Sequence, residues 1–160
     1  MKGLLDCHPR SHQRAERGQS MVEMALMMTM LLVILSAVLD LGRGFFSFIA
    51  IQNAAAEGAL YAAINPRCRD ANVTGCSDPN NVVFRARHES PDGLVDKQRM
   101  AIDVSCDDGA TCGSGALIEG RPVTVTVVYQ FQMLGPFSGV VPDGTLPFRA
   151  HAVQNILDVK

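Results

Sequence analysis

The hydrophobic pattern of the chain opens with one long apolar run. Between Met21 and Leu39, the only polar side chains are those of Glu23, Thr29 and Ser36. At about 1.5 Å per residue, a helix over this run would be roughly 28 Å long, close to the thickness of a bilayer's hydrocarbon core. The run is also longer than the apolar part of a cleaved secretory signal, which has about 7–15 residues. It therefore predicts a retained transmembrane helix, with a signal peptide as the weaker alternative.

The apolar pattern continues past the expected membrane segment as a stripe with helical period. Apolar residues recur at steps of three and four and include the alanine-rich stretch QNAAAEGALYAAIN. The expected stripe consists of Phe45, Phe48, Ile49, Ala55, Ala56, Ala59, Leu60 and Ala63. The residues expected on another side of the helix are Asp40, Arg43, Ser47, Glu57 and Tyr61.

We expect this helix to run without interruption from about Gln19 to Ile64. The dipeptide Asn65-Pro66 ends it, because a residue before proline is disfavoured in the helical conformation. Gly42 and Gly44 lie just beyond the membrane segment, where they predict a bend.

The period changes from helical to alternating in the second half of the chain. Residues 102–106, 122–132 and 148–155 alternate apolar and polar side chains, as strands with one buried face do. The apolar positions of the last two strands are Val123, Val125, Val127, Tyr129, Phe131, Phe148, Ala150 and Ala152. Such a sheet needs a covering layer, and the alanine-rich stripe can supply it. The sequence thus predicts an α+β fold, in which a single-pass N-terminal transmembrane helix continues into an amphipathic helix packed on a small antiparallel sheet.

Two connecting segments complete the predicted fold. The stretch SDPNNVVFRARHE predicts a short helix that ends near Glu89, with Ser77 or Asp78 as its N-cap and Pro79 in its first turn. Residues 133–148 form an apolar connection between the last two strands. We expect this connection to fold onto the head, and a contact surface for membrane or for a neighbouring subunit is the alternative.

These patterns divide the chain into four parts. They are a basic leader at 1–18, a transmembrane helix at 19–40, an amphipathic helical extension at 41–65 and a β-rich head at 66–160. The leader has a net charge of +2, from Lys2, Arg10, Arg14 and Arg17 against Asp6 and Glu16, whereas the whole chain has a net charge of −2. Because a basic flank stays on the cytoplasmic side of a membrane, the head is expected to be exported. The charge balance does not favour nucleic-acid binding.

Four of the five cysteines lie beyond the expected membrane helix, at Cys68, Cys76, Cys106 and Cys112. An even number of cysteines in an exported domain favours disulfides over a zinc site, and the short C-x-x-C knuckles of zinc ribbons are missing. The spacing suggests two local loops, Cys68 to Cys76 and Cys106 to Cys112, although four cysteines allow three pairings.

The sequence carries no motif that indicates catalysis. It lacks the H-E-x-x-H metal motif, the G-x-x-x-x-G-K-[S/T] phosphate loop and the G-x-S-x-G nucleophile motif. We therefore expect a protein that is not an enzyme and that uses no cofactor and no metal.

The start of the apolar run resembles the processing site of type IV pilin-like proteins. Basic residues precede Gly18, and Glu23 follows five positions later at the head of the apolar helix. By this resemblance a membrane peptidase cuts between Gly18 and Gln19, and Glu23 becomes the fifth residue of the mature chain.

Residues 17–64 resemble, more specifically, the N-terminal region of the TadE-like family, pseudopilins of the machinery that builds Flp (tight-adherence) pili. The matching elements are Gly18, Val22-Glu23, Asp40, Gly42-Arg43, Phe45-Phe46, Asn53-Ala54-Ala55, Glu57-Gly58-Ala59 and Tyr61-Ala62. The resemblance implies a structural minor pilin or pseudopilin with a pilin-like head. It implies a bacterial inner-membrane protein with a cytoplasmic N-terminus and a periplasmic head, and it leaves open whether the subunit enters the surface pilus.

The partners implied by the resemblance are the major Flp pilin, sibling pseudopilins, the prepilin peptidase, the inner-membrane assembly platform and membrane lipid. An alternative of another class is an unprocessed single-pass membrane protein whose periplasmic head binds a ligand or a partner. The state of the N-terminus distinguishes the two, because only the first is cleaved after Gly18.

The chemistry of Glu23 supports an assembly role. Cleavage would free an α-amine on Gln19, one helical turn from Glu23 and on the same face. An unpaired carboxylate in lipid costs on the order of several kcal/mol. The Glu23 carboxylate could pair with the α-amine of its own chain or with that of a neighbouring subunit. Assembly would then satisfy a charge that a lone subunit leaves poorly paired. Asp40 and Arg43 are expected to form either an ordinary interfacial ion pair or a subunit contact. Glu57 is expected to be either solvated or paired with another subunit.

Overall fold

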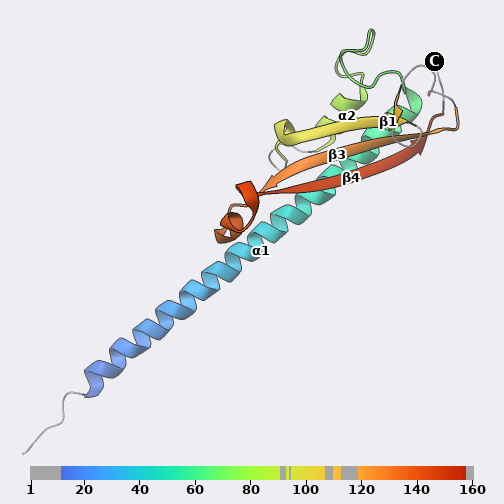
Figure 1. Ribbon diagram of the computed structural model, residues 1–160. Coiled ribbons are helices and arrows are strands. Elements are labelled where there is room, and N and C mark those ends of the chain that lie inside the picture. The colour runs from blue at the N-terminus through green and yellow to red at the C-terminus, as the bar shows by residue number, and fades with distance from the viewer. Residues whose placement is uncertain (1–11, 91–92, 94, 107–109, 113–118, 158–160) are drawn as a thin grey trace, which may run out of the picture.

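The structure, a computed structural model, describes residues 12–90, 93, 95–106, 110–112 and 119–157. A long helix runs through the whole molecule, and a small head of strands and one short helix packs on its C-terminal half (Figure 1). This arrangement confirms the predicted α+β fold. Residues 1–11 of the predicted leader and most of the segment between 107 and 118 lie outside the described residues.

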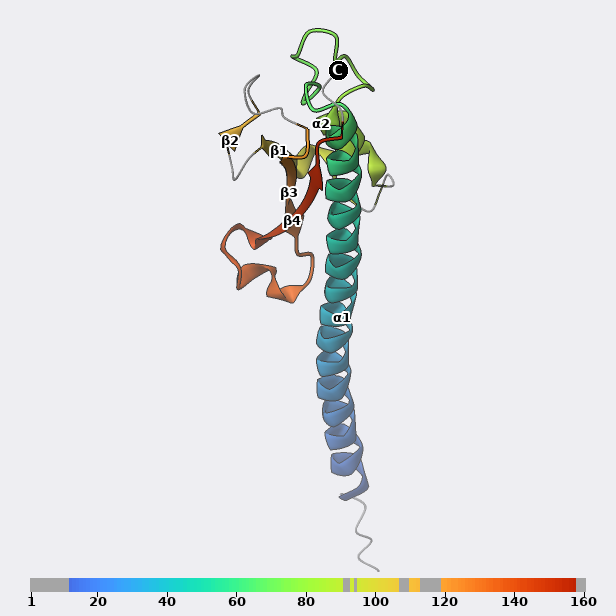
Figure 2. The same ribbon diagram turned by 90° about the vertical axis from the view of Figure 1, so that its right-hand side faces the viewer.

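The long helix α1 (His12–Ile64) has 53 residues and is about 80 Å long at 1.5 Å per residue. It passes through Gly42 and Gly44 without the expected bend, and the ribbon is continuous in both views (Figure 2). A glycine lowers helix propensity by about 1 kcal/mol but keeps its backbone N–H, so it weakens a helix without breaking it. The predicted end at Ile64 is confirmed.

The short helix α2 (Val82–Glu89) begins later than the sequence predicts. Its N-cap is Asn81, whose side-chain oxygen accepts a hydrogen bond from the N–H of Phe84 at 2.7 Å. The predicted N-caps Ser77 and Asp78 are therefore wrong. The amide nitrogen of Asn81 also donates to the carboxylate of Asp78 at 2.6 Å, which holds the asparagine in the capping position.

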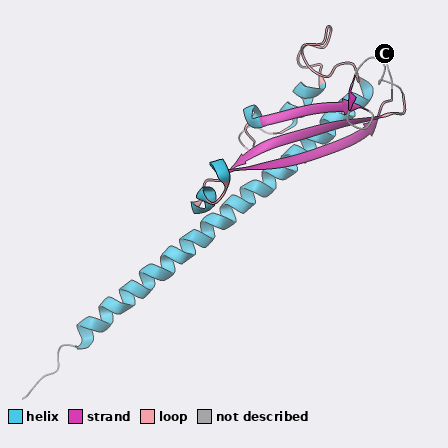
Figure 3. Ribbon diagram, in the orientation of Figure 1, coloured by secondary structure: helices cyan, strands magenta, loops and turns pink. Residues whose placement is uncertain are grey.

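An antiparallel sheet in the order β2-β1-β3-β4 forms the second layer of the head (Figure 3). The strands are β1 (Met100–Cys106), β2 (Ala110–Thr111), β3 (Pro122–Gln132) and β4 (Thr145–Asn155). Three of them are the strands that alternation predicted, and β2 adds a two-residue edge. Val127 in β3 lies opposite Ile102 in β1 and Ala150 in β4. The alternate residues of β3 from Val123 to Phe131 are buried, as the pattern predicts.

The connections between these strands contain short 3-10 turns. They are η1 (Lys97–Arg99), which precedes β1, and η2 (Pro136–Gly139) and η3 (Pro142–Gly144), which lie between β3 and β4. The last two belong to the apolar connection, and Figure 1 shows them at the end of the head that lies nearest the free half of α1.

The buried face of α1 is displaced by about one residue from the predicted stripe. Its fully buried residues include Ile51, Ala54, Ala55, Ala59 and Ala62, whereas Ala56 and Leu60 of the predicted stripe are exposed. Ser47, expected on the polar side, is buried. The reason is that α1 lies close to the sheet and to α2, and small side chains fit between them better than large ones. A Cβ on Gly58 would lie 3.0 Å from Ala86 Cβ and 3.1 Å from Val125 Cγ1, so helix and head meet with no room for a side chain there.

Candidate functional site

The predicted processing residues lie on one exposed stretch of α1. The side-chain nitrogen of Gln19 donates to the Glu23 carboxylate at 3.2 Å, so the two residues share a face of the helix one turn apart. A Cβ on Gly18 would meet no atom within 4 Å, and both Gln19 and Glu23 are exposed. Among the described residues, no cation pairs with Glu23. The geometry is thus compatible with cleavage after Gly18 and with an amine on Gln19 reaching Glu23, both of which stay predictions.

The helix around Glu23 has an apolar surface that the other described residues do not cover. Alpha1 contains a stretch long and apolar enough to cross a membrane, and none of that stretch is buried. Thr29 satisfies its hydroxyl within the helix by donating to the carbonyl of Ala25 at 2.8 Å. The large exposed apolar residues are Met21, Val22, Met24, Leu26, Met27, Met28, Met30, Leu31, Leu32, Val33, Ile34, Leu35, Val38 and Leu39. Exposing an apolar surface of this size to water is unfavourable, so lipid or another apolar helix is needed to cover it.

Asp40 lies at the end of this surface and is turned towards the head. The sequence pattern placed Asp40 on the polar side of the helix, but the residue is buried. Its carboxylate accepts hydrogen bonds from the backbone N–H of Gly135 at 2.6 Å and from that of Leu134 at 3.4 Å. Asp40 therefore joins α1 to the apolar connection between β3 and β4. No signal near Asp40 in the sequence could have found these partners, because they lie 94 and 95 residues away.

Arg43 links the same carboxylate to the sheet. Its Nη1 donates to Asp40 Oδ1 at 3.2 Å, and its guanidinium lies 5.5 Å from the ring centre of Phe131. The Arg43 side chain is 48% exposed, so its charge remains largely in solvent. The ion pair predicted between Asp40 and Arg43 is present within one chain, and the role of these residues in contacting another subunit stays a prediction.

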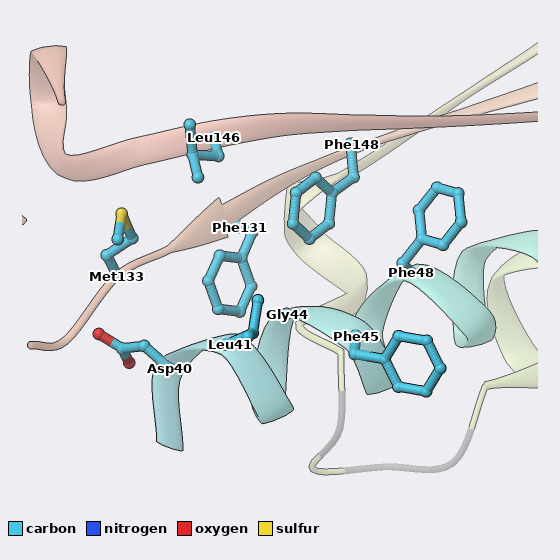
Figure 4. Close-up of a pocket in the computed structure, with 9 residues that line it drawn as sticks. All are labelled: Asp40, Leu41, Gly44, Phe45, Phe48, Phe131, Met133, Leu146 and Phe148. Atoms are coloured by element: carbon cyan, nitrogen blue, oxygen red, sulfur yellow. The ribbon is translucent and has the colours of Figure 1, made fainter. Parts of the chain in front are cut away.

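An apolar cavity of about 440 Å³ lies beside Asp40, between α1 and the ends of β3 and β4 (Figure 4). It is lined by Asp40, Leu41, Gly44, Phe45, Phe48, Phe131, Met133, Leu146 and Phe148. Phe131 and Phe148 stack with ring centres 5.3 Å apart, and Phe48 meets Phe148 edge-on at 6.2 Å. Gly44 lies directly against these rings, since a Cβ there would be in van der Waals contact with Phe148 Cζ at 3.6 Å. Phe45, the first residue of the aromatic pair in the sequence motif, thus borders a hollow that the described residues do not fill.

Glu57 lies in the alanine-rich half of α1, on the side that faces α2. It is half-buried and borders a shallow depression with Pro79, Phe84, Arg85 and His88. The small residues around it pack inward on the sheet, as described for Gly58. Glu57 has no ion pair within the described parts of the chain, and its pairing with another subunit stays a prediction.

Two disulfides fasten the loops of the head. Cys68 is bonded to Cys76, and Cys106 is bonded to Cys112. These are the two local loops that the cysteine spacing suggested. Within the described ranges, no group of three or more His, Cys, Asp or Glu side chains is arranged to hold a metal ion.

The comparisons with known proteins bear on α1. Residues 18–60 match the model of the family described as TadE-like protein, which confirms the resemblance seen in the sequence. The match begins at the glycine of the predicted processing site, ends in the alanine-rich segment and includes none of the sheet. No curated protein and no solved structure matches the chain. The match indicates involvement in the tight-adherence (Flp) pilus system.

Proposed function

We propose that this chain is a minor pilin or pseudopilin that acts in the assembly of Flp-type pili and has no catalytic role. The observation that carries the proposal is the TadE-like match over 18–60, on a helix whose apolar half is left uncovered by the described part of the chain. Such a helix is suited to packing beside other pilin helices in the membrane or at the base of a fibre. The head would stay on the periplasmic side of the bacterial inner membrane.

Glu23 gives this assembly its electrostatic driving force. In a single subunit the carboxylate is next to the neutral side chain of Gln19, and the helix that follows it is lined by exposed apolar residues. Cleavage after Gly18 creates an ammonium group one turn away, and packing of several such helices brings more of them within reach. Because an unpaired charge in lipid is costly, the assembled state is favoured over the lone subunit.

The partners follow from this mechanism. The prepilin peptidase would recognise Gly18 and the residues after it, whereas the major pilin and sibling pseudopilins would contact the apolar helix around Glu23. The inner-membrane assembly platform would act on the same helix from the membrane. Asp40 and Arg43 would contribute to subunit contacts through the exposed guanidinium, and Glu57 through its half-buried carboxylate.

The mass of the protein isolated from cell membranes tests the proposal. We expect a chain that starts at Gln19, and we expect Gly18→Val to keep the leader. Gly42→Val is the matched control, since Gly42 is also an open helical glycine, and it should be processed normally. A wild-type protein that retains its leader would contradict the proposal and favour an unprocessed membrane protein whose head binds a ligand, for which the apolar cavity would be the candidate site.

A further inference from the structure

The connection between β3 and β4 places two large apolar side chains in an unusual position. Residues 133–144, here called the membrane-proximal loop, contain Leu134, which is 70% exposed, and Val140, which is 79% exposed. The loop is fixed to α1, because the backbone N–H groups of Leu134 and Gly135 both donate to the Asp40 carboxylate. A loop held in place this firmly could have turned its apolar residues inward, yet these two point outward.

The height of the loop along α1 is fixed by contacts on one helical turn. Gly135 lies against Ser36 and Asp40, since a Cβ there would be 2.9 Å from Ser36 Oγ and 2.6 Å from Asp40 Oδ2. Ser36 and Asp40 flank the last residues of the apolar run that begins at Met21. One turn rises about 5.4 Å, so residues 134 and 135 stand within a turn of the point where the hydrocarbon-length segment ends.

The loop is therefore continuous with the apolar surface of the helix. Leu39, Leu41 and Phe45 are exposed on α1 near this level, and η2 also contacts α1. Figure 2 shows the loop standing beside the middle of α1 and facing away from the sheet. If α1 spans a bilayer, the boundary between headgroups and acyl chains surrounds this level of the helix, and the loop that carries Leu134 and Val140 stands beside it.

We propose that the membrane-proximal loop inserts Leu134 and Val140 into the phospholipid bilayer at the boundary between headgroups and acyl chains. The head would then rest on the membrane at a second point besides α1, with Asp40 fastening the two together. The charge of the loop indicates how it binds. Asp143 is its only charged residue, so attraction to anionic lipid plays no part and insertion rests on apolar contact. The inference depends on α1 spanning a bilayer and is independent of any role in pili.

Tryptophan fluorescence tests the proposal well, because the natural chain contains no tryptophan. The full chain carrying Val140→Trp or Leu134→Trp is reconstituted at high dilution in phosphatidylcholine vesicles whose acyl chains are brominated near the headgroup. Indole rings are favoured at this boundary, and we expect bromine to lower their emission about twofold or more, with a blue-shifted maximum. The effect should be equal in neutral vesicles and in vesicles with added anionic lipid.

Two controls use equally exposed positions elsewhere. Leu157 is 69% exposed and lies at the far end of the head, where its N–H donates to the carbonyl of Ala63. Ala63 is 23 residues beyond Asp40 on α1, or roughly 35 Å, so Leu157→Trp should be unaffected by bromine. Leu31→Trp, in the middle of the apolar run, should be quenched by bromine placed deep in the acyl chains.

The outcomes distinguish whether lipid, a neighbouring protein or solvent contacts the loop. Quenching of Val140→Trp and Leu134→Trp no greater than that of Leu157→Trp overturns the proposal. A blue shift without quenching also overturns it, because it places a neighbouring protein rather than lipid on the loop. Quenching that requires anionic lipid contradicts apolar insertion. An unquenched Leu31→Trp would remove the premise that α1 spans the bilayer, a failure that is recognisable by itself.

Discussion

The carboxylate of Asp40 accepts a hydrogen bond from the backbone N–H of Gly135 at 2.6 Å, which joins residues 95 positions apart. Asp40 belongs to the TadE-like segment, whereas Gly135 belongs to the head beyond it. The contact couples the orientation of α1 to that of the sheet. It also gives this motif residue a function inside the single chain, before any subunit contact is considered.

Replacement of Asp40 is expected to loosen the head. In Asp40→Ala, the N–H groups of Leu134 and Gly135 lose their acceptor, and an unsatisfied buried donor costs about 1–3 kcal/mol. The melting temperature of the detergent-solubilised chain should fall. Arg43→Ala is the matched control and should cost only about 0–1 kcal/mol, because its ion pair is half exposed. Equal melting temperatures for Asp40→Ala and the wild type would show that the contact does not stabilise the fold.

A side chain at Gly58 is expected to separate α1 from the head. The Cβ alone would lie 3.0 Å from Ala86 and 3.1 Å from Val125, so Gly58→Val must push these elements apart, at a cost of about 1–3 kcal/mol. A Cβ on Gly42 would meet no atom within 4 Å, so Gly42→Val should leave the melting temperature nearly unchanged. Thermal unfolding followed by circular dichroism measures both variants. If the two glycines tolerate valine equally well, the close packing at Gly58 is not what positions the sheet.

The two disulfides are expected to stabilise the head independently. Replacing both cysteines of a pair with serine, in Cys68/Cys76 or in Cys106/Cys112, should lower the free energy of unfolding by about 2–4 kcal/mol. The small size of the head makes this loss a large share of its stability. Urea unfolding of each double variant measures the effect. A head whose unfolding midpoint does not change after verified reduction would have no structural need for these bonds.

Asp70 is expected to make the stability of the first disulfide loop depend on pH. The backbone N–H of Asn72 and the side chain of Arg69 donate to its carboxylate at 2.9 and 3.1 Å, and they hold the Asp70 pKa below its ordinary value of 3.8. A lowered pKa in the folded state adds stability above that ordinary value, and this stability is lost as the pH falls through the folded-state pKa.

The variant Asp70→Asn checks the sign of this effect. It should melt slightly below the wild type at about pH 6, and the difference should shrink as the pH falls through the lowered pKa of Asp70 and the wild-type carboxyl becomes protonated. The effect is small because Asp70 is partly exposed. A difference that grows as the pH falls would mean that the pKa of Asp70 is raised rather than lowered.

The fold could be predicted from sequence wherever a local period decided it. The alternation in 122–132 gave both the strand and its buried face, because strand side chains alternate whatever lies around them. The predicted buried face of α1 was less accurate. Large apolar residues such as Leu60 were included in it, although small residues make the close contact with the sheet. The α2 N-cap was wrong because Ser77 and Asp78 are good capping residues in isolation, and only tertiary contacts select Asn81.

The candidate site divides in the same way. Gly18, Gln19 and Glu23 were chosen through the resemblance to pilin-like processing sites; the structure places Gln19 and Glu23 one helical turn apart, and their role in processing stays a prediction. The burial of Asp40 could not be foreseen, because it depends on a backbone N–H far along the chain. The exposure of Leu134 and Val140 was equally hidden, since a hydrophobic loop sequence does not indicate which of its residues face outward.

Glu23 is the residue on which the proposed function depends most directly. The decisive measurement is pilus production by cells that carry Glu23→Ala in place of the wild-type chain, together with the amount of the protein in the membrane. Thr29→Ala is the matched control, because Thr29 lies in the same apolar run and its hydroxyl is satisfied within the helix. We predict normal membrane levels for both variants, pili with Thr29→Ala and none with Glu23→Ala. Normal piliation with Glu23→Ala would contradict the account.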